Sequence, residues 1–453
     1  MSPDQVSSIS SLGVVFILLM GALLILLPRR LALLPIAMTT CYMTFGEQLI
    51  IGGLHFTMLR MLVLMGCARL VLRNDLRKFK WLQMDTLMLL WILASIVTYT
   101  LLWQTSEALI NRLGLAYDAA GFYFVFRCLV RDVEDVKRYC RVFALVLFPL
   151  AVCMCIEKAT GRNPFAVFGG VPEITVIREG TLRCQGPFGH PILAGTFGAV
   201  WLPMFVGLWW QRKNHRAVAA IGIVASTLIT VLSGSSGPVA VYLGAIVALG
   251  MWFARKRMAM VRWGILAALL LLQAVMKAPI WFVFAHLNIF SGSTGWHRAN
   301  LIDRTVGHFW DWWLVGTKDT ISWGVWAGDI TNQFISQAVR GGLVTLVLFI
   351  CIIVLAYSRL GKTMQRAKKS SRHAHLLLWA IGSTLFAHIV GFFNVSYFDQ
   401  NIVNWYLLLA TVATVEIAYG SDRQMQKRTT SQVELVTAGV GSECAVPQPA
   451  QSL

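Results

Sequence analysis

The chain has 453 residues, of which 57% are hydrophobic and only 13% are charged, and its mean hydropathy is +0.65. Soluble domains carry about a quarter charged residues, so this composition excludes an ordinary soluble protein and predicts an integral membrane protein. Lys and Arg outnumber Asp and Glu by 39 to 21, which gives a formal net charge of +18. Basic loops that hold helices against the cytoplasmic leaflet explain this excess better than a nucleic-acid partner, and none is expected.

Thirteen apolar segments are candidate transmembrane helices, because a bilayer core needs about 20 apolar residues per helix. The segments lie near residues 11–28, 31–45, 56–72, 86–103, 107–127, 139–157, 188–210, 217–233, 237–254, 262–285, 339–358, 375–393 and 402–419. The second and fifth are the weakest, and the fifth contains Arg112 and Asp118, charges that are costly inside a span. The predicted fold class is therefore an all-α polytopic integral membrane protein with about 12–13 transmembrane helices.

The basic residues predict the orientation of these helices. Alternate loops and the tail hold 28 of the 39 Lys and Arg residues, and the positive-inside rule places these loops in the cytoplasm. The N-terminus and the two longest remaining loops, residues 158–187 and 286–338, then face outward. We accordingly divide the chain into N-terminal transmembrane helices (1–157), a core with the outward loops (158–420) and a polar tail (421–453). The tail is predicted to be disordered and cytoplasmic.

Signals of several other protein classes are missing from the sequence. Most of the nine Cys residues lie in apolar segments, and no Cys or His spacing is typical of a metal site, so neither a metal nor a cofactor is expected. No internal repeat indicates a transporter that is built from two halves.

The first outward loop contains the sequence EITVIREGTLR, whose partial alternation predicts a short hairpin that turns near Glu179. Such a hairpin brings Arg178 and Arg183 to the outer surface, beside His190 at the start of the next helix. A helix start favours an anion, and guanidinium groups bind phosphate in a bidentate manner. These residues predict a phosphate or diphosphate site, although Arg183 could instead pair only with lipid headgroups or with Glu179.

The second outward loop is predicted to contain one amphipathic helix over residues 296–313. Its apolar stripe comprises Ile302, Val306, Phe309, Trp310 and Trp313, and its polar face comprises His297, Arg304, His308 and Asp311. A Trp-rich amphipathic helix beside a bilayer is expected to lie in the interface. Its Trp residues fit an interfacial belt better than a sugar-stacking platform. Its polar face either contacts only water or contributes to the predicted functional site.

The end of this loop also carries polar residues. Asp329 and Asn332 precede an apolar segment, and Arg340 lies within that segment or at its mouth. A charged residue at this depth normally has a functional role or a partner. The following Gly341-Gly342 pair could allow close helix packing.

Three motifs in these regions resemble the O-antigen ligase and O-antigen polymerase family. The motifs are RCQGPFGHPILA from Arg183, SGSTGWHRANLI around Arg298, and TNQFISQAVRGGL from Thr331. The last is similar to the His-Asn motif that precedes a Gly-containing span in that family. The resemblance covers roughly residues 160–410, and the order, spacing and shared outward placement of the motifs strengthen it.

The resemblance implies a metal-independent polytopic glycosyltransferase, multi-pass in the bacterial inner membrane. Such an enzyme takes an oligosaccharide from undecaprenyl diphosphate at the outer face and transfers it to lipid A core or to another lipid-linked glycan. Arg183 and Arg298 would hold the diphosphate, which fits the argument from guanidinium chemistry. Further substrate-binding candidates are Arg178, Arg304, His190, Asn332 and Arg340. Membrane lipid and a polysaccharide export machinery are the other expected partners.

Two departures from the family pattern affect the expected activity. Thr331 stands where the ligases carry a His, and Thr cannot act as a base, so Asp329, His297 and His308 become the candidate catalytic bases. Ser236-Gly237 stands where members often carry Ser-Arg. The first departure favours a polymerase of surface polysaccharide slightly over a ligase. Two other hypotheses stay open, namely a transporter of polysaccharide or lipid-linked sugar and a catalytically inactive assembly partner.

Overall fold

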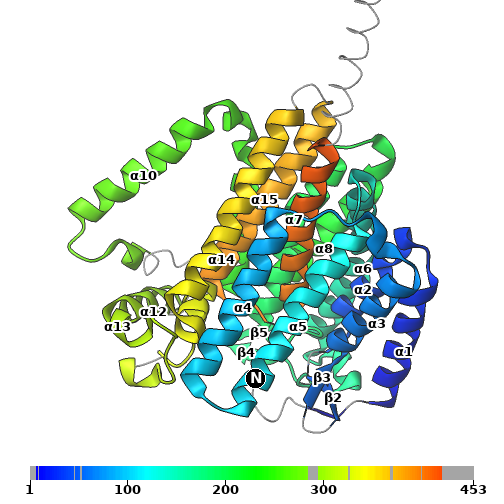
Figure 1. Cartoon of the computed structure of the whole chain (residues 1–453), viewed down its shortest axis with the longest axis horizontal. Coiled ribbons are helices and arrows are strands. Elements are labelled where there is room, and N and C mark those ends of the chain that lie inside the picture. Colours follow the sequence, from blue (N-terminus) through cyan, green and yellow to red (C-terminus); the bar gives the residue numbers. More distant parts are fainter. Residues whose placement is uncertain are drawn as a thin grey trace, which may run out of the picture.

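The computed structural model describes residues 7–8, 10–44, 46–51, 54–283, 294–324, 327–367, 371–398 and 400–420, so the predicted tail 421–453 lies outside the described residues. The fold is all-α, a helical bundle with two small sheets at one end (Figure 1). Eight helical stretches of the described chain are long and apolar enough to cross a membrane. This finding supports the prediction of a multi-pass membrane protein.

The described residues up to Thr160 form six α-helices. They are α1 (Ser11–Leu26), α2 (Leu33–Tyr42), α3 (Met58–Leu72), α4 (Gln83–Trp103), α5 (Ser106–Leu129) and α6 (Val133–Thr160). A short sheet joins β1 (Ser7–Ser8), β2 (Glu47–Ile51) and β3 (Leu54–Thr57) in that order. Side-chain caps fix several helix starts, because Ser10, Thr57, Thr105 and Asp132 each accept a hydrogen bond from a first-turn N–H group.

The described residues after Thr160 supply the remaining α-helices and a hairpin. The helices are α7 (Pro191–Trp209), α8 (Arg216–Leu232), α9 (Ser236–Gly250), α10 (Met258–Val275), α12 (Thr294–Gly307), α13 (Phe309–Trp312), α14 (Gln333–Arg366), α15 (Arg372–Asn394) and a last helix, Gln400–Gly420. The hairpin pairs β4 (Val176–Arg178) with β5 (Thr181–Arg183). Glu179 and Gly180 both have positive φ, as a two-residue hairpin turn requires, so the predicted hairpin is confirmed.

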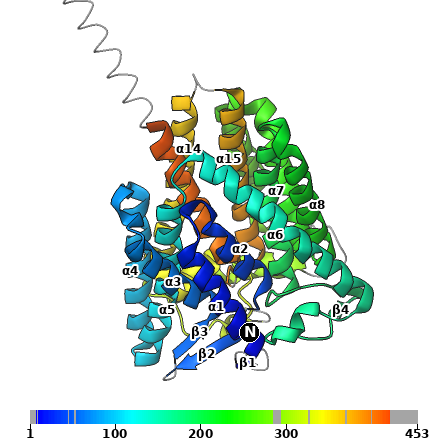
Figure 2. The same cartoon turned by 90° about the vertical axis from the view of Figure 1, so that its right-hand side faces the viewer.

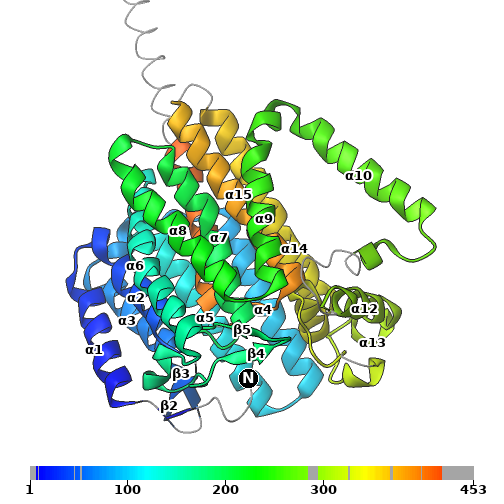
Figure 3. The same ribbon diagram turned by 180° about the vertical axis from the view of Figure 1, so that it is seen from behind.

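Each of the thirteen predicted segments contains a helix, but several helices are short. The ten residues of α2 extend about 15 Å, roughly half of a bilayer core. The segments of α9 and α10 form one apolar stretch, Ser236–Val275, in which a 3-10 helix at Met251–Arg257 joins them. None of the α10 residues is buried, and α10 extends away from the bundle (Figure 3). How many of the thirteen segments cross the bilayer, and in which direction, therefore stays a prediction.

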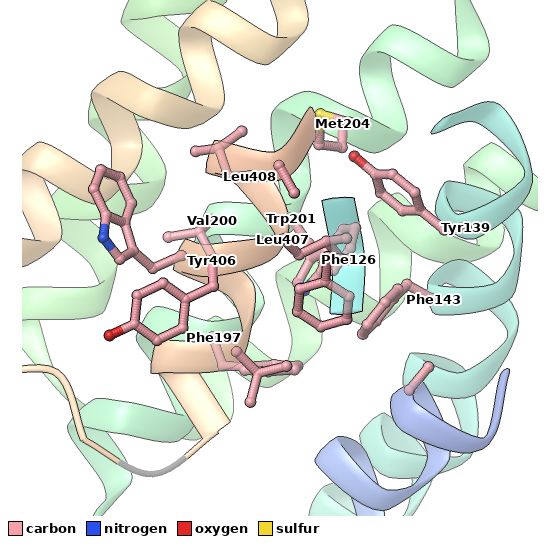
Figure 4. Packing of buried hydrophobic residues seen from close by; sticks show 14 of the residues in the cluster. Phe126, Tyr139, Phe143, Phe197, Val200, Trp201, Met204, Tyr406, Leu407 and Leu408 are labelled. Carbon is pink, nitrogen blue, oxygen red and sulfur yellow. The ribbon is translucent and has the colours of Figure 1, made fainter. Parts of the chain in front are cut away.

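Helix α7 lies at the centre of the bundle and packs against α6, α8, α9 and α15. Nearly all of its residues are buried, and Trp201 stacks on Phe143 of α6 at 4.1 Å between ring centroids (Figure 4). Buried residues from the predicted N-terminal part (1–157) and from the predicted core part (158–420) belong to one continuous hydrophobic core. This rigid core fixes the start of α7 next to the β4–β5 hairpin.

The connections between helices gather at two opposite ends of the bundle. The two sheets lie at one end, and the last turns of α14 and the first turns of α15 lie at the other (Figures 1 and 2). Helices α12 and α13 lie toward the end with the sheets (Figure 1). The predicted outward loops therefore share one end of the molecule.

The predicted single helix over residues 296–313 is wrong. The structure has two helices, α12 and α13, because the backbone leaves the helical region at His308 (φ −97°, ψ 30°). The buried residues of this segment include Leu301 and Trp312, which pack with Ala338 and Val339 of α14 in a second, smaller core. Trp310, from the predicted apolar stripe, is 77% exposed and remains available to a membrane interface.

Helix α14 is interrupted at Gly342, whose backbone is non-helical (φ +68°, ψ −172°). The hydrogen bond from Leu343 N to Val339 O that a continuous helix would make is replaced by two bonds to the preceding loop. Leu343 N donates to Trp313 O, and Thr317 N donates to Val339 O, each at 2.8 Å. Broken backbone within an apolar helix needs such partners, so the break joins α14 firmly to the segment after α13.

We expect Gly342→Ala to destabilise the protein by about 2 kcal/mol or more, because Gly342 has positive φ. The new Cβ would also lie 2.4 Å from Leu314 O. The matched control is Gly361→Ala in the same helix, where a Cβ meets nothing within 4 Å. Thermal unfolding of the two detergent-purified variants measures the difference, and equal melting temperatures would contradict this account.

Candidate anion site at the start of α9

Arg183 and Arg298, far apart in the sequence, both reach the turn that begins α9. Arg183, at the end of β5, donates from Nε to Ser235 Oγ at 3.2 Å and also contacts this oxygen through NH2. Arg298, from α12, also reaches the start of α9, because a Cβ added to Gly237 would lie 3.1 Å from its NH2. The structure thus brings together the two arginines that the sequence singled out.

Two helix starts meet at the same place. Ser235 is the N-cap of α9, and its side chain makes no capping hydrogen bond with the helix. The second turn of α7 packs directly on this turn, since a Cβ on Gly195 would lie 2.3 Å from Ser233 Oγ and 2.7 Å from Pro238 Cβ. Helix N-termini carry free N–H groups and partial positive charge. The geometry therefore joins two helix starts to two guanidinium groups.

The charges at this turn have little compensation. Within the described part of the chain, neither Arg183 nor Arg298 forms an ion pair with a carboxylate; Glu179, in the same hairpin as Arg183, pairs with Arg178 at 3.8 Å. Burial, followed by the neighbouring charge of Arg178, lowers the pKa of Arg183, and burial lowers the pKa of Arg298 to about 10. Both arginines stay protonated at neutral pH, and their desolvation favours binding of an anion.

Glu157, near the end of α6, holds the loop that carries Arg183. Its Oε1 accepts from Gln185 N at 3.1 Å and from the Thr175 hydroxyl at 3.2 Å, and its Oε2 accepts from Gly186 N at 2.9 Å. Sequence reasoning missed this residue because it belongs to no motif. The available signal was a carboxylate at the end of an apolar segment, where a charge requires partners.

His190 is the N-cap of α7, and its Nδ1 accepts a hydrogen bond from Ile192 N at 3.1 Å. The side chain reaches solvent, yet desolvation by the surrounding atoms, and then the charges of Arg183 and Arg178, lower its pKa to about 4. The ring is therefore neutral at pH 7, as its acceptor role requires. His190 supports the site by starting α7 beside the arginines.

The other predicted binding residues lie in different places. Arg178 is at the exposed edge of the hairpin, and Arg304 is exposed on α12 beside Gly324. Asn332 is the N-cap of α14, where its Oδ1 accepts from Phe334 N at 2.9 Å and from Ile335 N at 3.2 Å. Arg340 lines a cavity between α4, α5 and α14.

Among the candidate bases, His308 has the arrangement that proton transfer needs. Its Nδ1 lies 2.9 Å from Asp311 Oδ2, and its ring stacks on Trp323 with centroids 5.0 Å apart. A carboxylate that holds Nδ1–H leaves Nε2 as the proton acceptor. His297 lies beside Arg298 on α12, and the Asp329 side chain is exposed just before α14. The sequence placed His308 and Asp311 on one face but did not identify them as a pair.

Comparison of the sequence with models of protein families and with curated proteins finds no match to either.

We expect Glu157→Gln to loosen the Arg183 loop, because the Gln amide presents a donor where a carboxylate oxygen now accepts. A buried N–H that loses its acceptor costs about 1–3 kcal/mol. Hydrogen–deuterium exchange should show faster exchange in the peptide that contains Gln185 and Gly186. The control is Glu173→Gln, which removes only an exposed ion pair with Arg162. Unchanged exchange in the Glu157 variant would rule out the clamp.

Proposed function

We propose that the chain is a metal-independent glycosyltransferase of a bacterial inner membrane. It takes a glycan from a polyprenyl diphosphate carrier at the outer face and joins it to an acceptor hydroxyl. The observation that carries this proposal is the meeting of Arg183 and Arg298 at the start of α9. The resemblance of the surrounding motifs to the O-antigen ligase and polymerase family supports the choice of substrate.

In this reaction the site must stabilise the leaving group. The acceptor oxygen attacks the anomeric carbon, the bond from that carbon to the diphosphate oxygen breaks, and negative charge develops on the diphosphate. Two guanidinium groups and two helix N-termini supply the preorganised positive charge that this step needs. These positive charges are in place before the reaction, so no residue of the site has to gain or lose a proton to provide this stabilisation.

The acceptor hydroxyl must lose a proton during the reaction. His308, oriented by Asp311, is the base that we favour, because Nε2 can take the proton while the carboxylate stabilises the resulting cation. His297 and Asp329 are the other candidates. Residue 331 is Thr, so the base does not lie at the position where the ligases of the O-antigen family carry a His.

The expected side of the membrane agrees with this chemistry. The arginine site lies at the end of the bundle with the hairpin and α12–α13, whereas the C-terminal end of α14, which carries Arg359, Lys362 and Arg366, lies at the opposite end (Figure 1). Positive connections are retained in the cytoplasm, so the site would face outward, where lipid-linked glycans are joined.

We expect Arg183→Lys and Arg298→Lys each to lower glycan transfer by about 100-fold or more, because Lys cannot reproduce bidentate contacts to a diphosphate. The amount of each variant in the membrane should equal that of the wild type. The control is Arg162→Lys in the same loop, where the side chain is 75% exposed. Transfer from undecaprenyl diphosphate oligosaccharide to an acceptor, followed with purified protein, is the measurement. Full activity of either variant would remove the diphosphate role.

Gene deletion separates the activities that this site could serve. Loss of long polymer, with single repeat units left on the carrier, would indicate a polymerase. Full-length polymer that stays on the carrier would indicate a ligase. Normal surface polysaccharide would reject the transferase and favour a transporter. An inactive assembly partner would show polymer loss on deletion and full rescue by Arg183→Lys.

We expect His308→Ala to reduce transfer by about 100-fold, in the range typical of a general base, and Asp311→Asn to reduce it less. His215→Ala, at the predicted cytoplasmic side, is the control. If Asp329→Asn is the severe variant and His308→Ala is mild, the base is Asp329.

A further inference from the structure

A cavity of about 140 Å³ lies inside the bundle, between α4, α5, α14 and the last helix. Most of its lining is aromatic or apolar, with Trp91, Phe349 and Trp405 among the contributors. Two arginines also line it, Arg112 from α5 and Arg340 from α14. Gly341 borders the cavity as well, so the space lies at the break in α14.

Arg112 has almost no solvent contact and few partners. Its side chain is 8% exposed, and its guanidinium stacks over the Tyr99 ring at 3.8 Å. One NH2 group makes a long contact of 3.5 Å with Arg340 O. Nε is buried and has no hydrogen-bond partner among the described residues. Arg340 is close enough for the two positive charges to repel each other.

Other arginines of the bundle are compensated by carboxylates. Arg127 pairs with Asp85 at 3.0 Å, and Arg69 lies 3.4 Å from Asp75. Asp118 also lines the cavity, but its carboxylate takes hydrogen bonds from Arg60, with the shortest ion-pair contact at 2.9 Å. Within the described part of the chain, no carboxylate pairs with Arg112 or Arg340.

We propose that Arg112 and Arg340 bind a phosphate group in this cavity, at a site separate from the turn at the start of α9. Arg112 is a buried cation without a carboxylate partner among the described residues, and Arg340, whose side chain is exposed at the border of the cavity, adds a second positive charge beside it. An uncompensated charge of this kind is costly in a membrane protein, and a bound anion removes that cost. Guanidinium groups suit phosphate because they offer paired, planar donors. The apolar lining suits the hydrocarbon chain that carries a lipid phosphate, and interrupted helices at membrane depth commonly border binding cavities.

The test uses the full chain in phosphatidylcholine nanodiscs and measures binding calorimetrically. The protein carries Arg183→Gln and Arg298→Gln, so that the site at the start of α9 does not contribute. The probes are farnesyl phosphate, inorganic phosphate and farnesol. Farnesyl phosphate should bind, farnesol should not, and Arg112→Gln or Arg340→Gln should weaken binding at least tenfold. Arg162→Gln is the matched control and should have no effect.

A second variant guards against misfolding of the arginine variants. Gln337 lines the cavity, and its Oε1 accepts from Trp91 Nε1 at 3.0 Å. Gln337→Glu keeps this acceptor but adds a negative charge beside the arginines. It should abolish phosphate binding and raise the melting temperature of the ligand-free protein.

The outcomes distinguish a lipid phosphate from free phosphate, and they test the cavity site independently of the proposed glycosyltransferase. Binding of inorganic phosphate as tightly as farnesyl phosphate, with the same arginine dependence, would support the site and assign it to free phosphate. Equal binding by the wild-type cavity and the Arg112→Gln and Arg340→Gln variants would overturn the site. Neither result tests the proposed glycan transfer, because the protein in these experiments carries Arg183→Gln and Arg298→Gln, which remove the site at the start of α9.

Discussion

The exchange of backbone hydrogen bonds at Gly342 is the constraint on which the arrangement of the site depends. Leu343 N and Val339 O separate at the break, and each finds its partner in the segment after α13. In an apolar environment an unsatisfied backbone group costs several kcal/mol. The loop is therefore not free to leave α14. The small core around Trp312 and Val339 adds apolar packing to the same junction.

This junction sets the position of Arg298. Helix α12 precedes the joined segment and shares its core through Leu301. Arg298 lies one turn earlier on α12 and reaches Gly237 at the start of α9. In a separate part of the chain, Glu157 holds the loop after the hairpin, Cys184 N donates to Leu232 O of α8, and Arg183 reaches Ser235. Two independently braced segments thus deliver one guanidinium each to the same turn, which is the preorganisation that charge stabilisation requires.

The sequence predicted the parts of this structure that depend on local patterns. Apolar segments located the helices, and the alternation around Glu179 located the hairpin, because both signals lie within a few residues. The break at His308 was missed because apolar spacing continues through it, while the burial of Trp312 depends on distant α14. Glu157 and the Arg112 cavity were not identified as sites for the same reason. Their partners are set by packing between helices, which no single segment of the sequence encodes. The meeting of Arg183 with Arg298 was anticipated only through the family resemblance.

The proposed sites, at the start of α9 and in the cavity, are neighbours across one short segment. Asn394, at the end of α15, packs beside Gly237, where Arg298 ends, and the nearby Phe392 and Tyr397 line the cavity. A transferase that joins two lipid-linked glycans must hold two phosphate-bearing lipids at once, with the donor diphosphate at the leaving-group position. The acceptor lipid needs only an anchor nearby, so that its sugar can reach the anomeric carbon. If both sites bind phosphate as proposed, the structure meets this requirement with the donor at Arg183 and Arg298 and the acceptor at Arg112 and Arg340. This pairing favours polymerisation of lipid-linked units over transfer to a single fixed acceptor.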